Sequence, residues 1–240
     1  MRQDKPFKTN DMKYSAHLSH DLFTVEEGRN LFYGGSQNMY ATPRERANGC
    51  GIAGAADIIM YFNALKEDRD KFSKDEFLSL SNVLRKHIPI IPGRGVNAFL
   101  LARGLNKCFK KQGLHYSSRW KWTWIKKWET VERMLNDDIP VILAIGNNFP
   151  LVWGKKQLNL YQKDEKETDL AEGEPVYKKA FEVCGHFVVI TAIEGNCLTV
   201  SSWGKKYYIN IDEYNRYVRK HSIHLYCNIL EIKKTPSHIV

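Results

Sequence analysis

The chain has 240 residues, enough for one large domain with a substantial core, and its 43% hydrophobic and 26% charged residues are ordinary for a globular protein. The net charge is +9, which favours either an anionic partner or a solvated basic face. No apolar run approaches the roughly 20 residues that span a bilayer, so we expect no transmembrane segment.

Turn formers and helical periodicity divide the first half of the chain. Residues 1–47 are polar and rich in turn residues, which predicts an extended lead-in with short elements. Apolar residues at helical spacing then begin abruptly, and the second helix opens with a capping box formed by Ser73 and Glu76. Helices are predicted over residues 50–65, 73–87, 97–112 and 129–136.

The second half is dominated by strand patterns. Apolar and β-branched runs predict strands over residues 141–145, 187–192, 197–200, 207–211 and 226–232, with a short helix over 212–218. Residues 146–181 have weak periodicity and predict a long loop. Helices followed by strands indicate a single α+β domain, with a lead-in (1–40), a helical half (41–136) and an antiparallel sheet half (137–240).

The five cysteines are odd in number and form no C-x-x-C pair. A complete disulfide framework is therefore impossible, a structural zinc site is not expected, and reduced thiols fit best. The histidines show no ligand spacing, so we predict no metal and no cofactor. The first six residues lack an apolar signal core. The compartment stays open: cytoplasmic, or secreted or cell-surface if a signal peptide has been removed.

Residues 98–128 contain eight Lys and Arg and no acidic residue. This basic segment is either a solvated face or a site for an anionic polymer. Its tryptophans Trp120, Trp122 and Trp124 alternate, which favours a strand with one buried face over a platform for stacking bases. We expect no obligatory nucleic-acid partner.

Cys50 has the sequence surroundings of a nucleophile. It opens a predicted helix, where unpaired backbone N–H groups and the helix dipole lower the pKa of a thiol. Gly49 and Gly51 flank it, so a substrate can approach the backbone closely and the Cys50 N–H can face an oxyanion. The alternative is a buried structural thiol.

A cysteine nucleophile needs an imidazole base, and His186 begins a predicted strand 136 residues later. The hairpin partner of that strand ends at Ser201, so this spacing can place the Ser201 hydroxyl beside the imidazole. Trp203 follows and is expected to cover the contact between His186 and Ser201. Taken alone, His186 would instead be a core histidine.

The ordered motifs Gly49-Cys50-Gly51, Gly185-His186-Phe187 and Ser201-Ser202-Trp203-Gly204 resemble those of papain-like cysteine peptidases. Within that superfamily the chain looks most like the bacterial C39-like peptidases, over about residues 40–218. The Asn48-Gly49-Cys50-Gly51 opening, the strand at 139–143 and the ending at 203–208 carry this likeness. The resemblance implies a papain-like fold with Cys50 and His186 as the catalytic pair.

The chain departs from the family pattern at three positions. Ser201 stands where the family has an orienting Asn or Asp, and Arg44 stands where it has an oxyanion Gln. The side-chain donor for the oxyanion is then Asn48 or Gln37. No aromatic residue follows Cys50, unlike papain itself.

The sequence therefore predicts a cysteine hydrolase that cleaves an amide bond, most simply in a peptide or protein substrate. Three alternatives remain. One is a degraded papain-like module that only binds peptides. The second is a peptidoglycan amidase or an acyl transferase that uses the same Cys–His pair. The third is a nucleic-acid binder through the tryptophan-rich basic stretch at residues 119–128.

Overall fold

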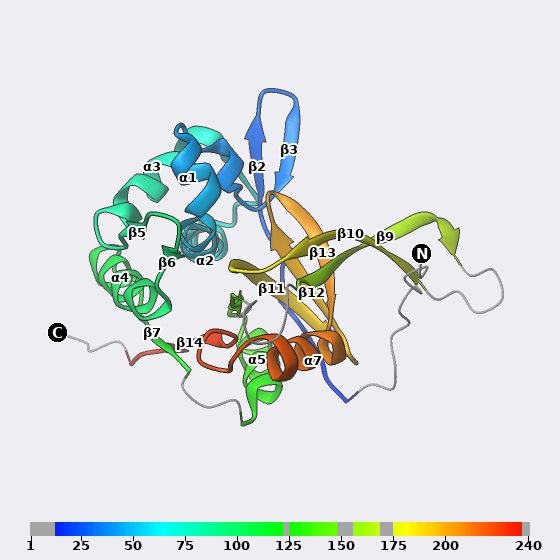
Figure 1. The fold of residues 1–240 in the computed structure, drawn as a ribbon. Helices are drawn as coiled ribbons and strands as arrows, with labels where there is room; N and C mark the ends of the chain where they lie inside the picture. The colour runs from blue at the N-terminus through cyan, green and yellow to red at the C-terminus, as the bar shows by residue number, and fades with distance from the viewer. Residues whose placement is uncertain (1–12, 122–124, 148–155, 169–174, 237–240) are drawn as a thin grey trace.

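The computed structural model describes residues 13–121, 125–147, 156–168 and 175–236. It is an α+β structure in which α1 to α4 group on one side of a large antiparallel sheet, while α5 and α7 pack apart from them (Figure 1). The helices are α1 (Pro43–Asn48), α2 (Cys50–Glu67), α3 (Lys74–Arg85), α4 (Ala98–Lys111), α5 (Lys127–Asn136) and α7 (Ile211–His221), and a 3₁₀ helix, η1, spans Gln37–Met39. Each helix predicted from the sequence is present, with boundaries shifted by up to three residues.

The large sheet has nine strands in the order β10-β9-β13-β12-β11-β8-β14-β7, with β1 also paired to β11. Its strands are β1 (Ser15–His17), β7 (Tyr116–Trp120), β8 (Val141–Ile145), β9 (Leu158–Thr168), β10 (Pro175–Val183), β11 (His186–Glu194), β12 (Cys197–Ser202), β13 (Lys205–Asn210) and β14 (Ile229–Lys234). The five predicted strands correspond to β8, β11, β12, β13 and β14. Neighbouring strands in this sheet are antiparallel.

Two smaller sheets lie beside the helices. One contains β2 (Thr24–Glu27), β3 (Asn30–Tyr33) and β4 (Lys71–Ser73), and the other contains β5 (Ile90–Ile91) and β6 (Gly95–Val96). The β2–β3 hairpin projects beyond the rest of the molecule (Figure 1). The chain enters the helical region directly after β3, so this hairpin fixes where the following loop meets α2.

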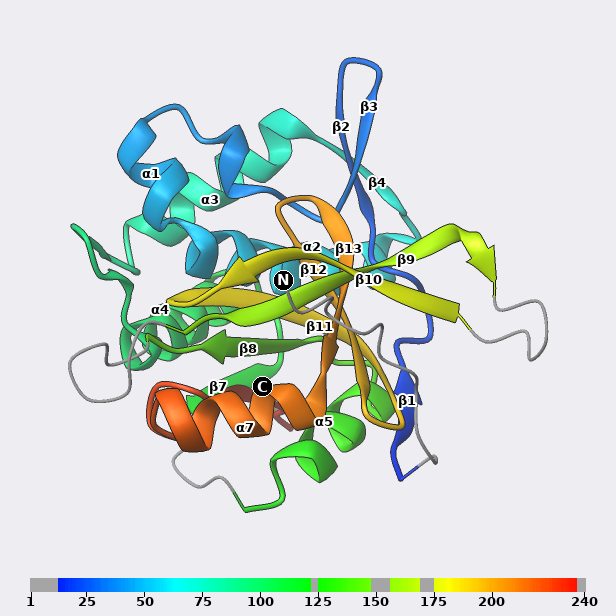
Figure 2. The same cartoon turned by 45° about the vertical axis from the view of Figure 1, so that its right-hand side comes forward.

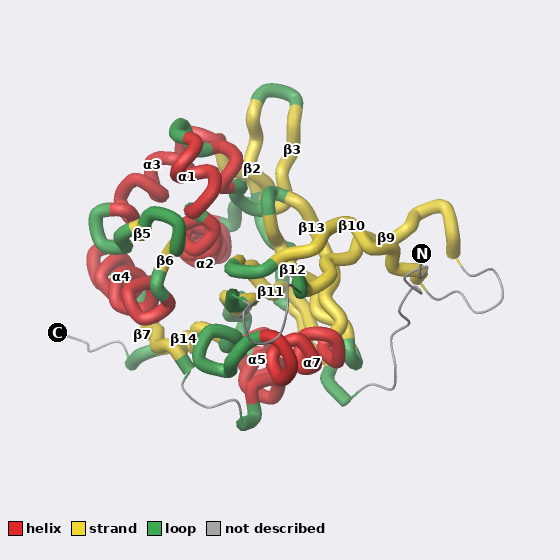
Figure 3. Tube along the Cα trace, viewed as in Figure 1, coloured by secondary structure: helices red, strands yellow, loops and turns green. Residues whose placement is uncertain are grey.

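Helix α2 is the centre of the packing. Its residues 50–62 are all buried, as expected for a helix that is apolar on every side. The small residues let the sheet approach closely: a Cβ on Gly54 would lie 3.4 Å from a methyl group of Val189 in β11. Figure 3 shows α2 between the helices α1, α3 and α4 and the strands. The first turn of α2 is thereby held against the edge where β11 begins.

The capping box predicted at the start of the second helix is present. Ser73 accepts a hydrogen bond from the Glu76 N–H, and Glu76 accepts one from the Ser73 N–H at 2.7 Å. Asn97 likewise caps α4 by accepting from Phe99 and Leu100. These caps satisfy N–H groups that have no partner within the helix, which explains why the sequence located both starts closely.

The prediction of a long loop over residues 146–181 is wrong for much of that stretch. Strands β9 and β10 form an antiparallel hairpin that joins β13 and then extends away from the body (Figure 2). Leu158, Leu160 and Tyr161 are buried near its inner end, whereas its outer part is rich in charged residues. The charged and apolar residues along this hairpin do not alternate regularly, which explains why the strand signal in the sequence is weak here.

Two further findings bear on the sequence expectations. All five cysteines are free thiols. Among the described residues, no helix is both long and apolar enough to cross a membrane. Of the alternating tryptophans, Trp120 is buried on β7, in line with the strand prediction, while Trp122 and Trp124 lie outside the described residues.

Candidate functional site

Cys50 is the first residue of α2, and Gly49 is the N-cap without a side-chain hydrogen bond. Cys50 is buried, with 8% of the residue exposed. A Cβ on Gly49 would lie 2.5 Å from both the Glu45 carbonyl oxygen and the Tyr40 ring, so no other residue fits there. The glycine before Cys50 therefore serves close packing of the turn between α1 and α2.

His186 is the first residue of β11, and its imidazole is buried. Its Nε2 lies 2.7 Å from the Ser202 Oγ. The expectation that Ser201 contacts His186 is wrong, since the Ser201 hydroxyl donates instead to the Tyr33 carbonyl oxygen at 2.8 Å. Successive side chains of β12 point to opposite faces of the sheet, so only one of the two serines can reach the imidazole.

Trp203 lies over the imidazole, as a cover for the contact between His186 and its hydroxyl partner. The two ring centroids are 4.5 Å apart and the planes are 20° from parallel. Trp203 and Gly204 both have positive φ and form the two-residue turn between β12 and β13. The turn thus aims the indole at His186, and a stacked indole shields the ring from water.

A small cavity connects these side chains. It has a volume of about 10 Å³, room for about one water molecule, and Cys50, His186, Ser202 and Trp203 all line it. Gln37 also lines it, from η1. The Gln37 Nε2 donates to the Arg46 carbonyl oxygen at 2.6 Å, which leaves its second hydrogen for another acceptor.

The other predicted donor, Asn48, does not line this cavity. Its Nδ2 donates to the Arg44 carbonyl oxygen at 2.9 Å, one helical turn earlier in α1. Gly51 lies in the first turn of α2, where a Cβ would meet Val96 at 3.0 Å. Of the two candidate side-chain donors, only Gln37 shares the cavity with Cys50.

Burial dominates the electrostatics of the site. It raises the pKa of the Cys50 thiol, against the opposing effect of backbone N–H groups of Phe187, Gly51 and Cys50 itself. It lowers the pKa of His186 to about 4. Both groups are therefore neutral at neutral pH, and a proton can pass from sulfur to imidazole without a change in their total charge.

Two polar side chains of the cavity were not singled out from the sequence. Ser202 differs from the predicted residue by a single step along β12. Asp57 is a buried carboxyl in α2, and it lines the same cavity as Cys50. It is the only acidic residue between 50 and 66, which is a visible signal, because an unpaired acid inside an apolar helix is unusual.

Within the described ranges, no group of three or more His, Cys, Asp or Glu side chains is placed to hold a metal ion. Comparison with protein-family models gave no matching family, and comparison with curated proteins gave no match. The inference of function therefore rests on the geometry and chemistry of the site.

The buried imidazole predicts a pH-dependent stability. Unfolded His186 takes up a proton near pH 6.5, whereas the folded state resists it until about pH 4. Stability is thus fully present above this window and falls as pH falls through it, by roughly 2 to 3 kcal/mol at pH 4.5. Urea unfolding at pH 7 and 4.5 measures the loss, which we expect to be smaller in His186→Gln. An equal loss in both proteins would contradict this assignment.

Proposed function

We propose that the protein is a cysteine hydrolase that cleaves an amide bond of a peptide or protein. The observation that carries the proposal is the shared cavity of Cys50, at the start of a helix, and His186, at the start of a strand, with Nε2 of the imidazole on Ser202. A helix N-terminus, an imidazole and an orienting hydroxyl are the parts that thiol catalysis needs. Their order along the chain resembles papain-like enzymes, and C39-like peptidases most.

The first half of the reaction forms a thioester. Cys50 attacks the carbonyl carbon, and the thiol proton passes to His186. In the tautomer that carries its hydrogen on Nε2, the ring donates to Ser202 and Nδ1 accepts the thiol proton. The Cys50 N–H and the Gln37 amide stabilise the oxyanion. His186 then protonates the leaving amine as the C–N bond breaks, and the acyl group remains on sulfur.

The second half is hydrolysis of the thioester. A water molecule attacks the acyl carbon and gives its proton to His186, the C–S bond breaks, and the proton returns to sulfur. Ser202 holds the imidazole but carries no charge, so it stabilises the imidazolium less than a carboxylate would. The enzyme is therefore expected to turn over more slowly than one with an acidic third residue.

Alkylation of Cys50 by iodoacetamide tests the pair. Between about pH 5 and 8 the pair retains one proton, so we expect a nearly constant rate in the wild type. In His186→Gln the rate should rise about tenfold per pH unit, as for an isolated thiol. Peptide mapping by mass spectrometry gives the rate, with half-buried Cys184 as the internal reference. If Cys50 shows the same profile in both proteins, the catalytic assignment fails and a peptide-binding role is favoured.

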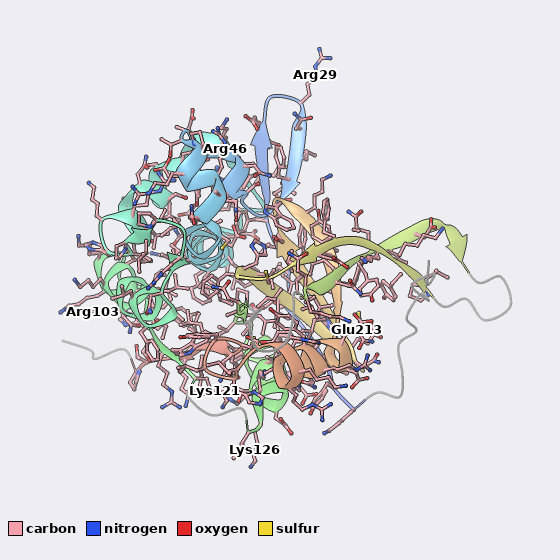
Figure 4. The ribbon with its side chains drawn as sticks, in the orientation of Figure 1. Arg29, Arg46, Arg103, Lys121, Lys126 and Glu213 are labelled. Carbon is pink, nitrogen blue, oxygen red and sulfur yellow. The ribbon has the colours of Figure 1, made fainter. Side chains whose placement is uncertain are left out.

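A basic groove suggests a second candidate substrate class. Arg103, Lys107 and Lys110 of α4 and Arg119 of β7 line this groove, which has a volume of about 650 Å³ and no acidic lining residue. Arg119 is bonded to Glu231 at 2.7 Å, whereas the three α4 cations form no ion pair within the described residues. Arg103 points outward from α4 (Figure 4). This charge favours an anionic polymer, and with it an amidase or acyl transferase acting on such a polymer.

Binding of fluorescent poly-L-glutamate, followed by anisotropy, tests the basic groove. The affinity should fall as salt rises, because exposed charge contacts are screened. Replacing both Arg103 and Lys107 by Glu should weaken binding by about tenfold or more. The matched control reverses Arg29 and Lys66, which are exposed elsewhere on the surface. Equal loss in both double variants would show that only net charge matters and that the groove is not a site.

A further inference from the structure

Asp57 is an acidic side chain in the most apolar helix of the protein. It is 3% exposed, and burial raises its pKa well above the ordinary value. Within the described residues it forms no ion pair. Carboxyl groups are rarely buried without a partner, because removing the charge from water is costly. Its retention in α2 therefore calls for a specific contact.

That contact is with the loop after β3. Oδ1 of Asp57 accepts a hydrogen bond from the Gly35 N–H at 2.7 Å. The loop has no space to shift toward the helices, since a Cβ on Gly35 would lie 2.0 Å from the Phe77 ring. A Cβ on Gly34 would lie 3.0 Å from Oδ2 of Asp57 and 2.9 Å from the Ser201 hydroxyl. Asp57 and Ser201 therefore both lie close against Gly34, from α2 and from β12.

Further hydrogen bonds tie the loop to the strand that contacts His186. The Tyr33 N–H donates to the Gly204 carbonyl oxygen at 2.8 Å, and the Tyr33 carbonyl oxygen accepts from Ser201 at 2.8 Å. Two residues after Gly35, the chain enters η1, which begins with Gln37. The loop therefore spans from the histidine side of the site to the cysteine side, and Asp57 is its anchor on α2.

We propose that Asp57 is a positioning residue: its hydrogen bond to the Gly35 N–H holds the loop 33–37 so that the Gln37 amide lines the cavity of Cys50 as an oxyanion donor. The inference rests on the proposed cysteine-hydrolase function. It assigns Asp57 no contact with substrate and no part in proton transfer.

The chemistry of the buried carboxyl fits this role. A neutral carboxylic acid offers one acceptor oxygen and one donor, and the acceptor meets Gly35. Asparagine has the same shape and the same acceptor, with NH₂ in place of the hydroxyl. If hydrogen bonding is what matters, Asp57→Asn preserves the site. If instead a negative charge of Asp57 acts on the Cys–His pair, Asp57→Asn removes that charge as completely as Asp57→Ala does.

The experiment is a double-mutant cycle on two reactions of Cys50. Acylation by 4-nitrophenyl acetate passes through an oxyanion, whereas alkylation by iodoacetamide does not. Gln37→Ala should slow acylation by about 100-fold, the usual loss for one oxyanion donor. Asp57→Ala should slow acylation by about tenfold or more with alkylation unchanged, and it should add nothing in the Gln37→Ala background. Asp57→Asn should recover most of the loss.

Several outcomes would overturn the proposal. They are an equal loss of acylation rate in Asp57→Asn and Asp57→Ala, additive losses of acylation rate in the double variant, a fall in the alkylation rate of Asp57→Ala, or no loss of acylation rate in Asp57→Ala. Hydrogen exchange of the Gly35 amide tests the contact directly. We expect this amide to be protected in the wild type and in Asp57→Asn but not in Asp57→Ala. If Asp57→Ala folds poorly, the comparison of the wild type with Asp57→Asn still tests the contact. If wild-type Cys50 is not acylated and its alkylation rate does not depend on His186, the proposed function fails. The hydrogen-exchange rate of the Gly35 amide would still show whether Asp57 holds the loop.

Discussion

The structure depends on burying α2 on every side. A helix can occupy that position only if its surface is apolar and its side chains are small where the sheet approaches, and residues 50–62 meet both conditions with the single exception of Asp57. This burial fixes the helix relative to β11, and so fixes where the first turn of α2 meets the first residue of β11. The positions of Cys50 and His186 are consequences of core packing.

The same burial determines the chemistry. In a cavity with room for about one water molecule, the neutral thiol and the neutral imidazole are favoured over the ion pair. Under the proposed function, a substrate carbonyl that enters the site would bring new dipoles into this cavity. Under the proposed function, the proton would move from thiol to imidazole during the attack. The buried thiol of the free protein is expected to be oxidised more slowly than an exposed cysteine.

Local signals made the helices and the central strands predictable. The caps at Ser73 and Asn97 and the apolar run of α2 are decided by nearby residues. The partner of His186 was not predictable to the residue, because a one-residue difference on β12 reverses the face on which a hydroxyl lies. The β9–β10 hairpin was missed because its apolar residues are interspersed irregularly with charged ones. Gln37 could be named as a candidate, but only long-range packing distinguishes it from Asn48.

The loop 33–37 has a consequence for how the site is divided along the chain. The thiol and the imidazole both lie after residue 49, yet the segment that joins their two sides comes from before residue 38. A fragment that starts at residue 41 would retain both reactive groups and lose the brace between them. A sequence search that matches only the Cys and His segments would accept such a fragment. Truncation of the polar lead-in would likewise remove part of the site itself.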